Sequence, residues 1–273
     1  MTHTANNYLF FLSALCGLLC FGCESTPLAA SGGATTSGSL ELMSYNIRHG
    51  VGMDGVLDLG RIAEVIRREA PDLVALQEID QNCTRSGGRD IARELGEALG
   101  MQAHFAKFMD FQGGEYGLAV LSRLPVVEVL RHRLPDGAEP RTALEVCCRV
   151  EGLAQPISFV CIHNDWTDDR IRQRQVQALL AAAGGQSRPT ILAGDFNAVP
   201  GDVSTDMFLC DGWSNLGDFE EHTFPADHPI KTIDYFMVKG FANHSGRTRV
   251  VEETMASDHR PIRATLRFEV LSQ

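Results

Sequence analysis

The sequence has no excess of positive charge. It contains 24 Lys and Arg residues against 35 Asp and Glu residues, which gives a formal net charge of −11. Proteins that bind nucleic acid usually carry a basic surface that neutralises backbone phosphates. The composition therefore disfavours a protein that holds a long polyanion by bulk electrostatic attraction, although a small basic cleft on an acidic body would escape this argument.

Several common signatures of enzymes and metal proteins are absent. No Ser, Cys or Thr lies in a nucleophile elbow of the G-x-S-x-G type, and no Walker phosphate-binding loop occurs. Cys20 and Cys23 have the spacing of zinc ligands, but no second cysteine pair or His cluster accompanies them. These absences argue against a covalent serine-type hydrolase and a zinc site, and they favour direct attack by water.

A hydrophobic run long enough to cross a membrane is also missing. Residues 8–22 form an uncharged apolar run, and no Lys, Arg, Asp or Glu occurs between Met1 and Cys23. A membrane-spanning helix needs about 20 such residues, whereas the apolar part of a signal peptide needs about 7–15. We therefore expect residues 1–23 to be a signal peptide that exports the chain from the cytoplasm.

Cys23 follows Gly22 at the end of this run, which resembles a lipoprotein cleavage site with Cys23 as the lipidated residue. Two features depart from that pattern. Position −3 is Cys20 rather than the usual Leu, and the residues before the run include His3 but no Lys or Arg. Cleavage to a soluble form and an uncleaved anchor remain the alternatives. The expected location is a membrane-tethered lipoprotein, or the periplasm or extracellular space.

The remainder of the chain reads as a linker followed by one domain. Residues 24–39 are small, polar and rich in Gly, which is typical of a flexible linker. Residues 40–273 have a length that suits a single large α/β domain. With 44% hydrophobic and 22% charged residues overall, the chain can bury a sizeable core.

Apolar periodicity predicts an alternation of strands and helices within the domain. Runs with period 2 or short apolar runs predict strands, and apolar residues at helical spacing predict helices. Strands that follow strands directly, mixed with a few helices, indicate mixed sheets rather than a purely parallel one. The expected helices are 59–69, 90–99 and 170–183, and the expected strands are 40–47, 73–77, a pair at 118–121 and 126–130, 143–150, 157–162, 190–193, 233–238 and 262–268.

Polar residues follow the apolar segments at several places far apart in the sequence. A single carboxylate at the end of a strand is usually a solvated loop residue. The recurrence of polar residues at several strand ends is harder to explain in that way. Mg²⁺ prefers oxygen ligands and keeps waters for a substrate phosphate, and a His beside a carboxylate can act as a base. The pattern predicts metal-assisted phosphate chemistry. Asp195 and Asn197 are two residues apart, so on extended backbone they would share one face. The residues expected to carry the chemistry are Asn46, Glu78, His163, Asp195, Asn197, Asp234, Asp258 and His259.

The motifs around these residues resemble the successive motifs of the endonuclease/exonuclease/phosphatase family. They occur in the family's order and span residues 44–261. The resemblance implies a four-layer α/β sandwich, in which two mixed β-sheets are flanked by helices and the site lies at one edge. The matching segments are SYNIRHG (44–50), LQEID (76–80), YGLAVLSRLP (116–125), CIHND (161–165), GDFN (194–197), IDYF (233–236) and SDHRP (257–261).

The resemblance implies a divalent metal site. Glu78 matches the primary Mg²⁺ ligand of the family, and Asp258 completes the site. Asn46 assists at the metal or at the phosphate. Mn²⁺ is the alternative ion.

The resemblance also implies the catalytic roles. Asp195 orients or activates the attacking water, and Asn197 binds phosphate. His259 acts as a base or contacts phosphate, and Asp234 orients it. His163 matches the family's second histidine, which stabilises or protonates the leaving oxygen. The match is poorer there, because the family's usual Thr-His-Leu is Ile-His-Asn in this sequence.

Three further segments resemble a bacterial branch near the lipid-remodelling, GPI-associated members of the family. They are CTRSGGRD (83–90), GGEYG (113–117) and EPRTAL (139–144). In that branch Arg85 and Tyr116 would contact substrate, and Arg141 would face phosphate. A salt bridge within a loop is the alternative for Arg85, and a tyrosine that covers the core is the alternative for Tyr116.

These observations together predict an exported, metal-dependent hydrolase of phosphoester bonds. We expect a phosphodiesterase or phosphomonoesterase that acts on a small or lipid-linked substrate. We also expect the protein to be a monomer. A secreted nuclease is the alternative among enzymes. A catalytically inactive binding module on the same fold is the alternative from another class, but such a module would be expected to have lost several of the polar residues.

Overall fold

The computed structural model describes residues 35–183, 188–217, 221–241 and 243–271, whose strands form two six-stranded sheets. The predicted signal peptide, Cys23 and most of the predicted linker lie outside the described residues. The first sheet has the order β11-β12-β1-β2-β4-β3, and the second has the order β5-β6-β7-β8-β10-β9. Each sheet contains one parallel pair, β1 with β2 and β7 with β8, among antiparallel neighbours. The mixed sheets predicted from the sequence are therefore confirmed.

The bounds of the elements are as follows. In the first sheet the strands are β1 Thr35–Asn46, β2 Leu73–Gln81, β3 Gln102–Phe111, β4 Gly114–Ser122, β11 Asn243–Val250 and β12 Ile262–Leu271. In the second they are β5 Val126–Leu134, β6 Arg141–Cys148, β7 Ile157–His163, β8 Thr190–Asp195, β9 Ser214–Asn215 and β10 Asp234–Lys239. The helices are α1 Leu59–Glu69, α2 Ile91–Leu99, α3 Asp169–Ala183 and α4 Val203–Cys210, with short 3-10 turns at Arg48–Gly50 and Thr84–Ser86.

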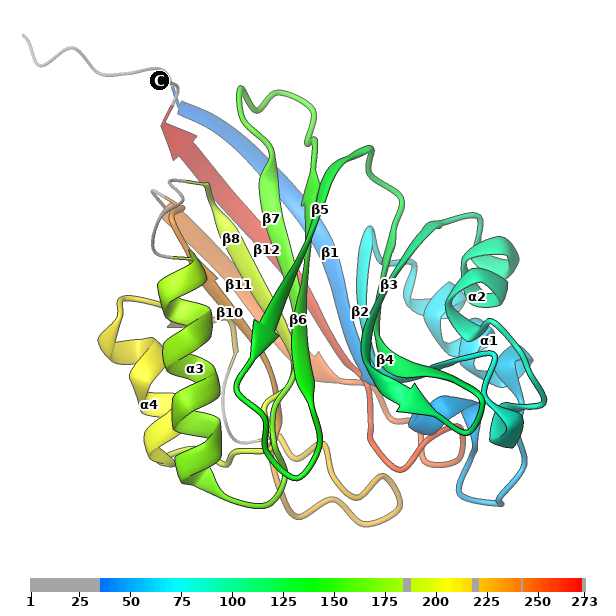
Figure 1. Ribbon diagram of the computed structural model, residues 1–273. Coiled ribbons are helices and arrows are strands. Elements are labelled where there is room, and N and C mark those ends of the chain that lie inside the picture. The colour runs from blue at the N-terminus through cyan, green and yellow to red at the C-terminus, as the bar shows by residue number, and fades with distance from the viewer. Residues whose placement is uncertain (1–34, 184–187, 218–220, 242, 272–273) are drawn as a thin grey trace, which may run out of the picture. The chain divides into compact units, whose positions relative to one another are not determined.

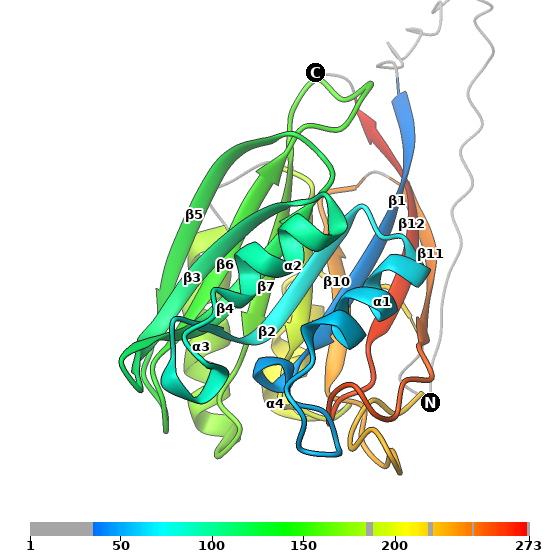
Figure 2. The same ribbon diagram turned by 90° about the vertical axis from the view of Figure 1, so that its right-hand side faces the viewer.

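These elements stack as four layers. Helices α1 and α2 cover the outer face of the first sheet, and α3 and α4 cover the outer face of the second (Figures 1 and 2). The inner faces of the two sheets pack on each other through buried side chains such as Leu42 and Phe159. Ile66 of α1 packs with Leu76 of β2 in one outer layer, and Leu179 of α3 belongs to the other. The predicted four-layer α/β sandwich is confirmed.

Helix α1 begins and ends where the sequence predicts, and α2 ends as predicted but begins one residue later, at Ile91. Asp58 and Asp90 each accept a hydrogen bond from a backbone N–H of the first turn. These N–H groups have no acceptor within the helix, so the side chains supply one. Gly100 ends α2 in a left-handed conformation with φ 65°, which suits a residue without a Cβ. The caps therefore fix both helices against the first sheet.

One predicted pairing is wrong. The strands at 118–121 and 126–130 were expected to form a pair, but β4 pairs with β2 and β3, while β5 pairs with β6 in the other sheet. Alternation of apolar residues identifies a strand but says nothing about its partner. Here the short segment between the strands carries the chain from one sheet to the other, so both sheets are tied together near this point.

Other elements lacked a clear signal in the sequence. The strand β11 is polar and mostly exposed, and backbone pairing with β12 holds it at the edge of its sheet. β3 and the short helix α4 were likewise not predicted. β1 begins at Thr35, inside the segment predicted as linker, and pairs there with β12. Within the described residues, no helix is long and apolar enough to cross a membrane.

Candidate active site

Three neighbouring strands of the second sheet place the acidic and His residues side by side. In the parallel pair of β7 and β8, His163 is the partner of Asp195. In the antiparallel pair of β8 and β10, Asp195 is the partner of Asp234. Residues that are directly opposite on neighbouring strands project from the same face and contact one another. The register of this sheet thus assembles a row of His163, Asp195 and Asp234.

The first sheet contributes Asn46 and Glu78 from its only parallel pair, β1 and β2. Glu78 was expected at the end of a strand, which is wrong, because β2 continues to Gln81. The register against β4 shifts between Gln77 and Ile79, and Glu78 has a φ of 61°. Such a β-bulge redirects a side chain, and bulges are frequent beside active sites. The bulge therefore explains how a residue in the middle of β2 reaches the site.

The GDFN segment depends on a sharp change of backbone direction. Gly194 has a φ of 152°, and a Cβ at this position would lie 2.1 Å from the carbonyl oxygen of Ile162. β8 ends at Asp195 and Asn197 has a φ of 50°, so the extended backbone expected across both residues is wrong. The backbone N–H of Asn197 instead donates to Asp195 Oδ1 at 2.9 Å. This turn still presents both side chains to one cavity.

That cavity has a volume of about 360 Å³ and collects most of the predicted site residues. Asn46 and Asp234 do not line it but contact residues that do. Asn46 Nδ2 donates to Glu78 Oε1 and to Asp195 Oδ2, both at 3.2 Å. The predicted residues that line the cavity are Glu78, Arg85, Tyr116, Arg141, His163, Asp195, Asn197, Asp258 and His259.

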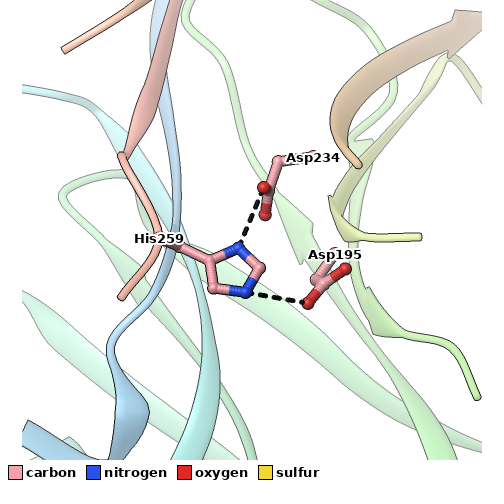
Figure 3. A group of neighbouring side chains, drawn as sticks. All are labelled: Asp195, Asp234 and His259. Carbon is pink, nitrogen blue, oxygen red and sulfur yellow. Dashed lines mark hydrogen bonds and ion pairs between the residues drawn. The ribbon is translucent and has the colours of Figure 1, made fainter. Parts of the chain in front are cut away.

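His259 lies between two carboxylates (Figure 3). Its Nδ1 is 3.0 Å from Asp234 Oδ2, and its Nε2 is 3.6 Å from Asp195 Oδ2. Burial of the ring opposes protonation, but the charges of Asp234 and Asp195 outweigh it and raise the pKa of His259. Burial raises the pKa of Asp195 as well, although His259 acts in the opposite direction. His259 is therefore an imidazolium, and it lies beside the Asp195 carboxylate, which accepts a proton readily.

Glu78 and Asp258 form a second acidic group. Burial, followed by repulsion from Asp258, raises the pKa of Glu78, and the hydrogen bond from Asn46 only partly offsets this. Arg48 Nε is 3.7 Å from Asp258 Oδ2 on the more exposed side. Carboxylates that the fold forces together suit a divalent cation, which removes their repulsion and takes oxygen ligands. These residues therefore fit the predicted metal site.

Another set of potential ligands is less suitable for a metal ion. Single ligand atoms of Asp195, Asp234 and His259 all lie within 4.8 Å of one another. The same two carboxylates keep His259 protonated, and an imidazolium has no lone pair to give to a cation. This set therefore suits proton transfer and contact with phosphate better than the binding of a cation.

His163 has the opposite electrostatic environment from His259. Its Nε2 is 3.5 Å from Asp195 Oδ2. Burial, together with the charges of Arg141 and His259, lowers the pKa of His163 far below its ordinary value. Its Nδ1 has no hydrogen-bond partner in the described part of the chain. His163 is thus a neutral ring, which can donate a hydrogen bond more readily than a proton.

The two arginines of the cavity differ in how they are held. Arg85 forms a two-pronged ion pair with the buried Asp80, at 2.8 and 2.7 Å, so the salt bridge expected as its alternative role is present. Arg141 is fully buried and pairs with Glu139 at 2.9 Å. Among the described residues nothing pairs with Arg141 Nε. Each guanidinium group is therefore paired with one carboxylate, and Arg141 also has a buried Nε without a partner among the described residues.

Aromatic rings support both guanidinium groups, and the Cζ of Arg141 is 5.0 Å from the ring centroid of Phe108. The Cζ of Arg85 is 4.5 Å from the ring centroid of Phe111 and 5.2 Å from that of Tyr116. Tyr116 is buried and meets Phe108 edge-on at 5.7 Å, which agrees with its alternative role of covering the core. Cation–π contacts of this kind stabilise and orient an Arg side chain. Tyr116 lines the cavity at the same time, so it has both a structural and a site position.

Sequence reasoning missed several residues of the cavity wall. Glu139 and Trp166 lie on loops with no periodic pattern, and Met109 and Phe111 belong to the unpredicted strand β3. Phe224 packs on His259, with ring centroids 4.8 Å apart. Trp166 directly follows the CIHND motif (161–165), and an aromatic residue in so polar a segment was a signal that could have identified it.

The chain is similar to known proteins in both sequence and structure. A model of the Endonuclease/Exonuclease/phosphatase family matches residues 43–259. No curated protein matches the sequence.

Among solved structures, an endonuclease/exonuclease/phosphatase family protein from Bacteroides thetaiotaomicron has 20% identity and a TM-score of 0.72, with 85% of this chain and 99% of that chain covered. A mannosyl-6-phosphatase from the same organism has 20% identity and a TM-score of 0.68, with 83% and 99% covered. TDP2 of D. rerio, humanized by 14 mutations, has 17% identity and a TM-score of 0.67, with 84% and 98% covered. At these identities the likeness establishes a shared fold.

Proposed function

The chain belongs to the endonuclease/exonuclease/phosphatase family, and from this premise we propose that it is a divalent-metal-dependent hydrolase of phosphoester bonds. One observation carries the proposal. His259 lies between Asp234 and Asp195 at a cavity that Glu78 and Asp258 also line. A protonated donor, a proton acceptor and paired acidic ligands at one place are what attack by water on a phosphoester requires.

The metal site consists of Glu78 and Asp258, with Asn46 fixing the orientation of the Glu78 carboxylate. A divalent cation held there would neutralise the charge that develops on the phosphate oxygens. Mg²⁺ suits a site with few protein ligands, because it retains several of its own waters, and Mn²⁺ is the alternative.

The remaining residues act on the water and the phosphate. The carboxylate of Asp195 takes a proton from the attacking water, whose oxygen forms a bond to phosphorus. The bond from phosphorus to the leaving oxygen breaks, and that oxygen takes up a proton from Asp195 or from solvent. His259 and Asn197 donate hydrogen bonds to phosphate oxygens, and Asp234 holds His259 in place. His163 donates a hydrogen bond to the leaving oxygen.

We propose a small or lipid-linked phosphoester as the substrate, rather than a nucleic-acid polymer. The net charge of −11 offers no bulk attraction to a polyanion. The cavity of about 360 Å³ is at the small end of ligand pockets, and Arg141 lines it with a guanidinium group of the kind that holds a single phosphate. The segments around Arg85 that resemble GPI-associated family members agree with a lipid headgroup, and the mannosyl-6-phosphatase shows that a protein of this fold acts on a small phosphoester.

The substrate proposal is tested with a panel of phosphoesters. The purified protein is incubated with bis-p-nitrophenyl phosphate, phosphoinositides, sphingomyelin or plasmid DNA, each with Mg²⁺ or with EDTA. We expect Mg²⁺-dependent hydrolysis of a small or lipid ester and intact plasmid. Plasmid nicking at enzyme levels that leave the other compounds untouched, lost in His259→Ala, would instead identify a nuclease.

We further propose that the chain is exported and tethered to a membrane through Cys23. Lipidation requires the thiol of this residue, so Cys23→Ser should abolish labelling by a radioactive or alkynyl fatty acid and leave the unprocessed precursor. Cys210→Ser serves as the matched control, because Cys210 is an exposed cysteine of the folded domain. Persistent labelling of Cys23→Ser, or no labelling of the unmodified chain, would contradict the tether.

A further inference from the structure

Trp166 is a large aromatic side chain left open to solvent at the active-site cavity. It is 64% exposed, and it lies on the loop between β7 and α3, three residues after His163. It lines the same cavity as Asp195 and His259. Exposed aromatic surface is unfavourable in water, so a Trp kept open beside a binding cavity suits contact with a ligand.

The backbone on both sides of Trp166 is held in place by Asp165, which is completely buried. One carboxylate oxygen of Asp165 accepts hydrogen bonds from Thr167 N at 2.8 Å and from Thr167 Oγ1. Its backbone N–H donates to Gln175 of α3 at 2.9 Å, and its carbonyl oxygen accepts from Arg172. The indole is therefore presented by a fixed loop, and little backbone freedom is lost when it meets a ligand.

Asp165 also joins this loop to the neighbouring one that carries Glu139. Its other carboxylate oxygen accepts a hydrogen bond from Ala138 N at 2.8 Å. A Cβ at Gly137 would lie 2.1 Å from the same oxygen, so the two loops approach as closely as glycine permits. Asp165 thus fixes Trp166 and Glu139 together at the cavity, one with a flat apolar face and the other with a carboxylate.

Most of the polar groups that handle phosphate come from other chain segments than Trp166 and Glu139. Asp195, His259 and Glu78 belong to the sheets or their ends, whereas Trp166 and Glu139 come from loops. A phosphate placed at the first group must direct the rest of the substrate toward other lining residues. The apolar C–H face of a saturated, hydroxylated ring can pack on the indole of Trp166, and hydroxyl groups at its edge can donate to the Glu139 carboxylate.

We propose that Trp166 forms a subsite for the leaving group and selects phosphoesters whose leaving group is a hydroxylated ring. A free sugar phosphate and an inositol headgroup share this chemistry. Open-chain leaving groups such as glycerol present no rigid C–H face to pack on the indole and gain nothing from Trp166. The inference rests on the proposed phosphoesterase function and assigns the specificity of the same site.

The test compares ring and open-chain esters of the same bond type. The purified protein and the variants Trp166→Ala and Trp166→Phe are assayed with Mg²⁺ on hexose 6-phosphate against glycerol 3-phosphate, and on phosphatidylinositol against phosphatidylglycerol vesicles. Val203→Ala is the control, because Val203 is 54% exposed on α4 and does not line this cavity. Comparison of hexose 6-phosphate with phosphatidylinositol shows whether the preferred ring belongs to a free phosphate ester or to a lipid headgroup.

We expect the wild type to prefer the ring member of at least one pair. Trp166→Ala should raise KM for that ring substrate about tenfold, as expected for the loss of one aromatic stack. It should leave kcat and the KM for the open-chain partner unchanged, and Trp166→Phe should restore most of the preference. Val203→Ala should change neither.

Equal effects of Trp166→Ala on both members of a pair, or no effect on either, would overturn the inference. Failure of the wild type to hydrolyse any ring substrate would overturn it too. Hydrolysis of bis-p-nitrophenyl phosphate under the same conditions would then show that the phosphoesterase function stands without this specificity.

Discussion

Glu78→Gln is expected to remove nearly all hydrolytic activity and yet to leave the metal-free protein at least as stable as the wild type. The two effects have one cause. Burial and repulsion from Asp258 raise the pKa of Glu78, so its charge is unfavourable until a cation binds. Gln keeps the shape and the contact with Asn46 but cannot serve as a charged ligand. Loss of a metal ligand that stabilises developing phosphate charge should cost about a thousandfold in kcat.

Both effects are measured on the same preparations. Activity is followed with saturating Mg²⁺, and the melting temperature is recorded in EDTA and then in Mg²⁺. Mg²⁺ should raise the melting temperature of the wild type and not that of Glu78→Gln, because only a protein that binds the ion is stabilised by it. Glu64→Gln on the exposed face of α1 is the control and should behave as wild type. Normal activity in Glu78→Gln would refute the metal assignment.

His259→Ala and Asp234→Asn should each lower kcat strongly. The kcat of the double variant should be little lower than that of the less active single variant. Asp234 holds His259 at 3.0 Å and keeps its ring protonated, so either substitution removes the same protonated donor. Loss of a group of this kind lowers kcat by about 10²–10⁴-fold. Residues that act as a unit give losses that do not multiply.

A double-mutant cycle on kcat measures the coupling directly. The four proteins are compared on one substrate, with His244→Ala on the exposed strand β11 as the control. Circular dichroism verifies that each variant is folded, because Asp234 and His259 are both buried. Losses that multiply independently would show that the two residues do not act as a pair.

The motifs that resemble the family predicted the sandwich, and local signals in the sequence predicted the helices α1, α2 and α3. The caps at Asp58 and Asp90 and the apolar spacing of α1 and α2 lie within a few residues of the helices they define. The site residues were also predictable, since each stands in a motif that can be matched one segment at a time. The strand register explains the alignment of His163, Asp195 and Asp234, whereas the other site residues reach the cavity from a bulge and from loops or other strands.

Features that depend on distant partners were not predictable. Nothing in the sequence near Glu78 shows that β2 bulges there, since the bulge exists only relative to β4. The separation of β4 and β5 into two sheets and the polar edge strand β11 are likewise set by pairing rather than by composition. Trp166 and Glu139 were missed because the loops that carry them converge only through the contacts of Asp165.

The most direct test of the metal-dependent phosphoesterase is removal and return of the metal in the wild-type protein. The purified protein is treated with EDTA, exchanged into metal-free buffer and assayed on bis-p-nitrophenyl phosphate before and after addition of Mg²⁺ or Mn²⁺. We predict no hydrolysis by the metal-free protein and full recovery with one of the two ions, in the wild type but not in Glu78→Gln. Undiminished hydrolysis in EDTA would contradict the account, because Glu78 and Asp258 would then have no cation to hold.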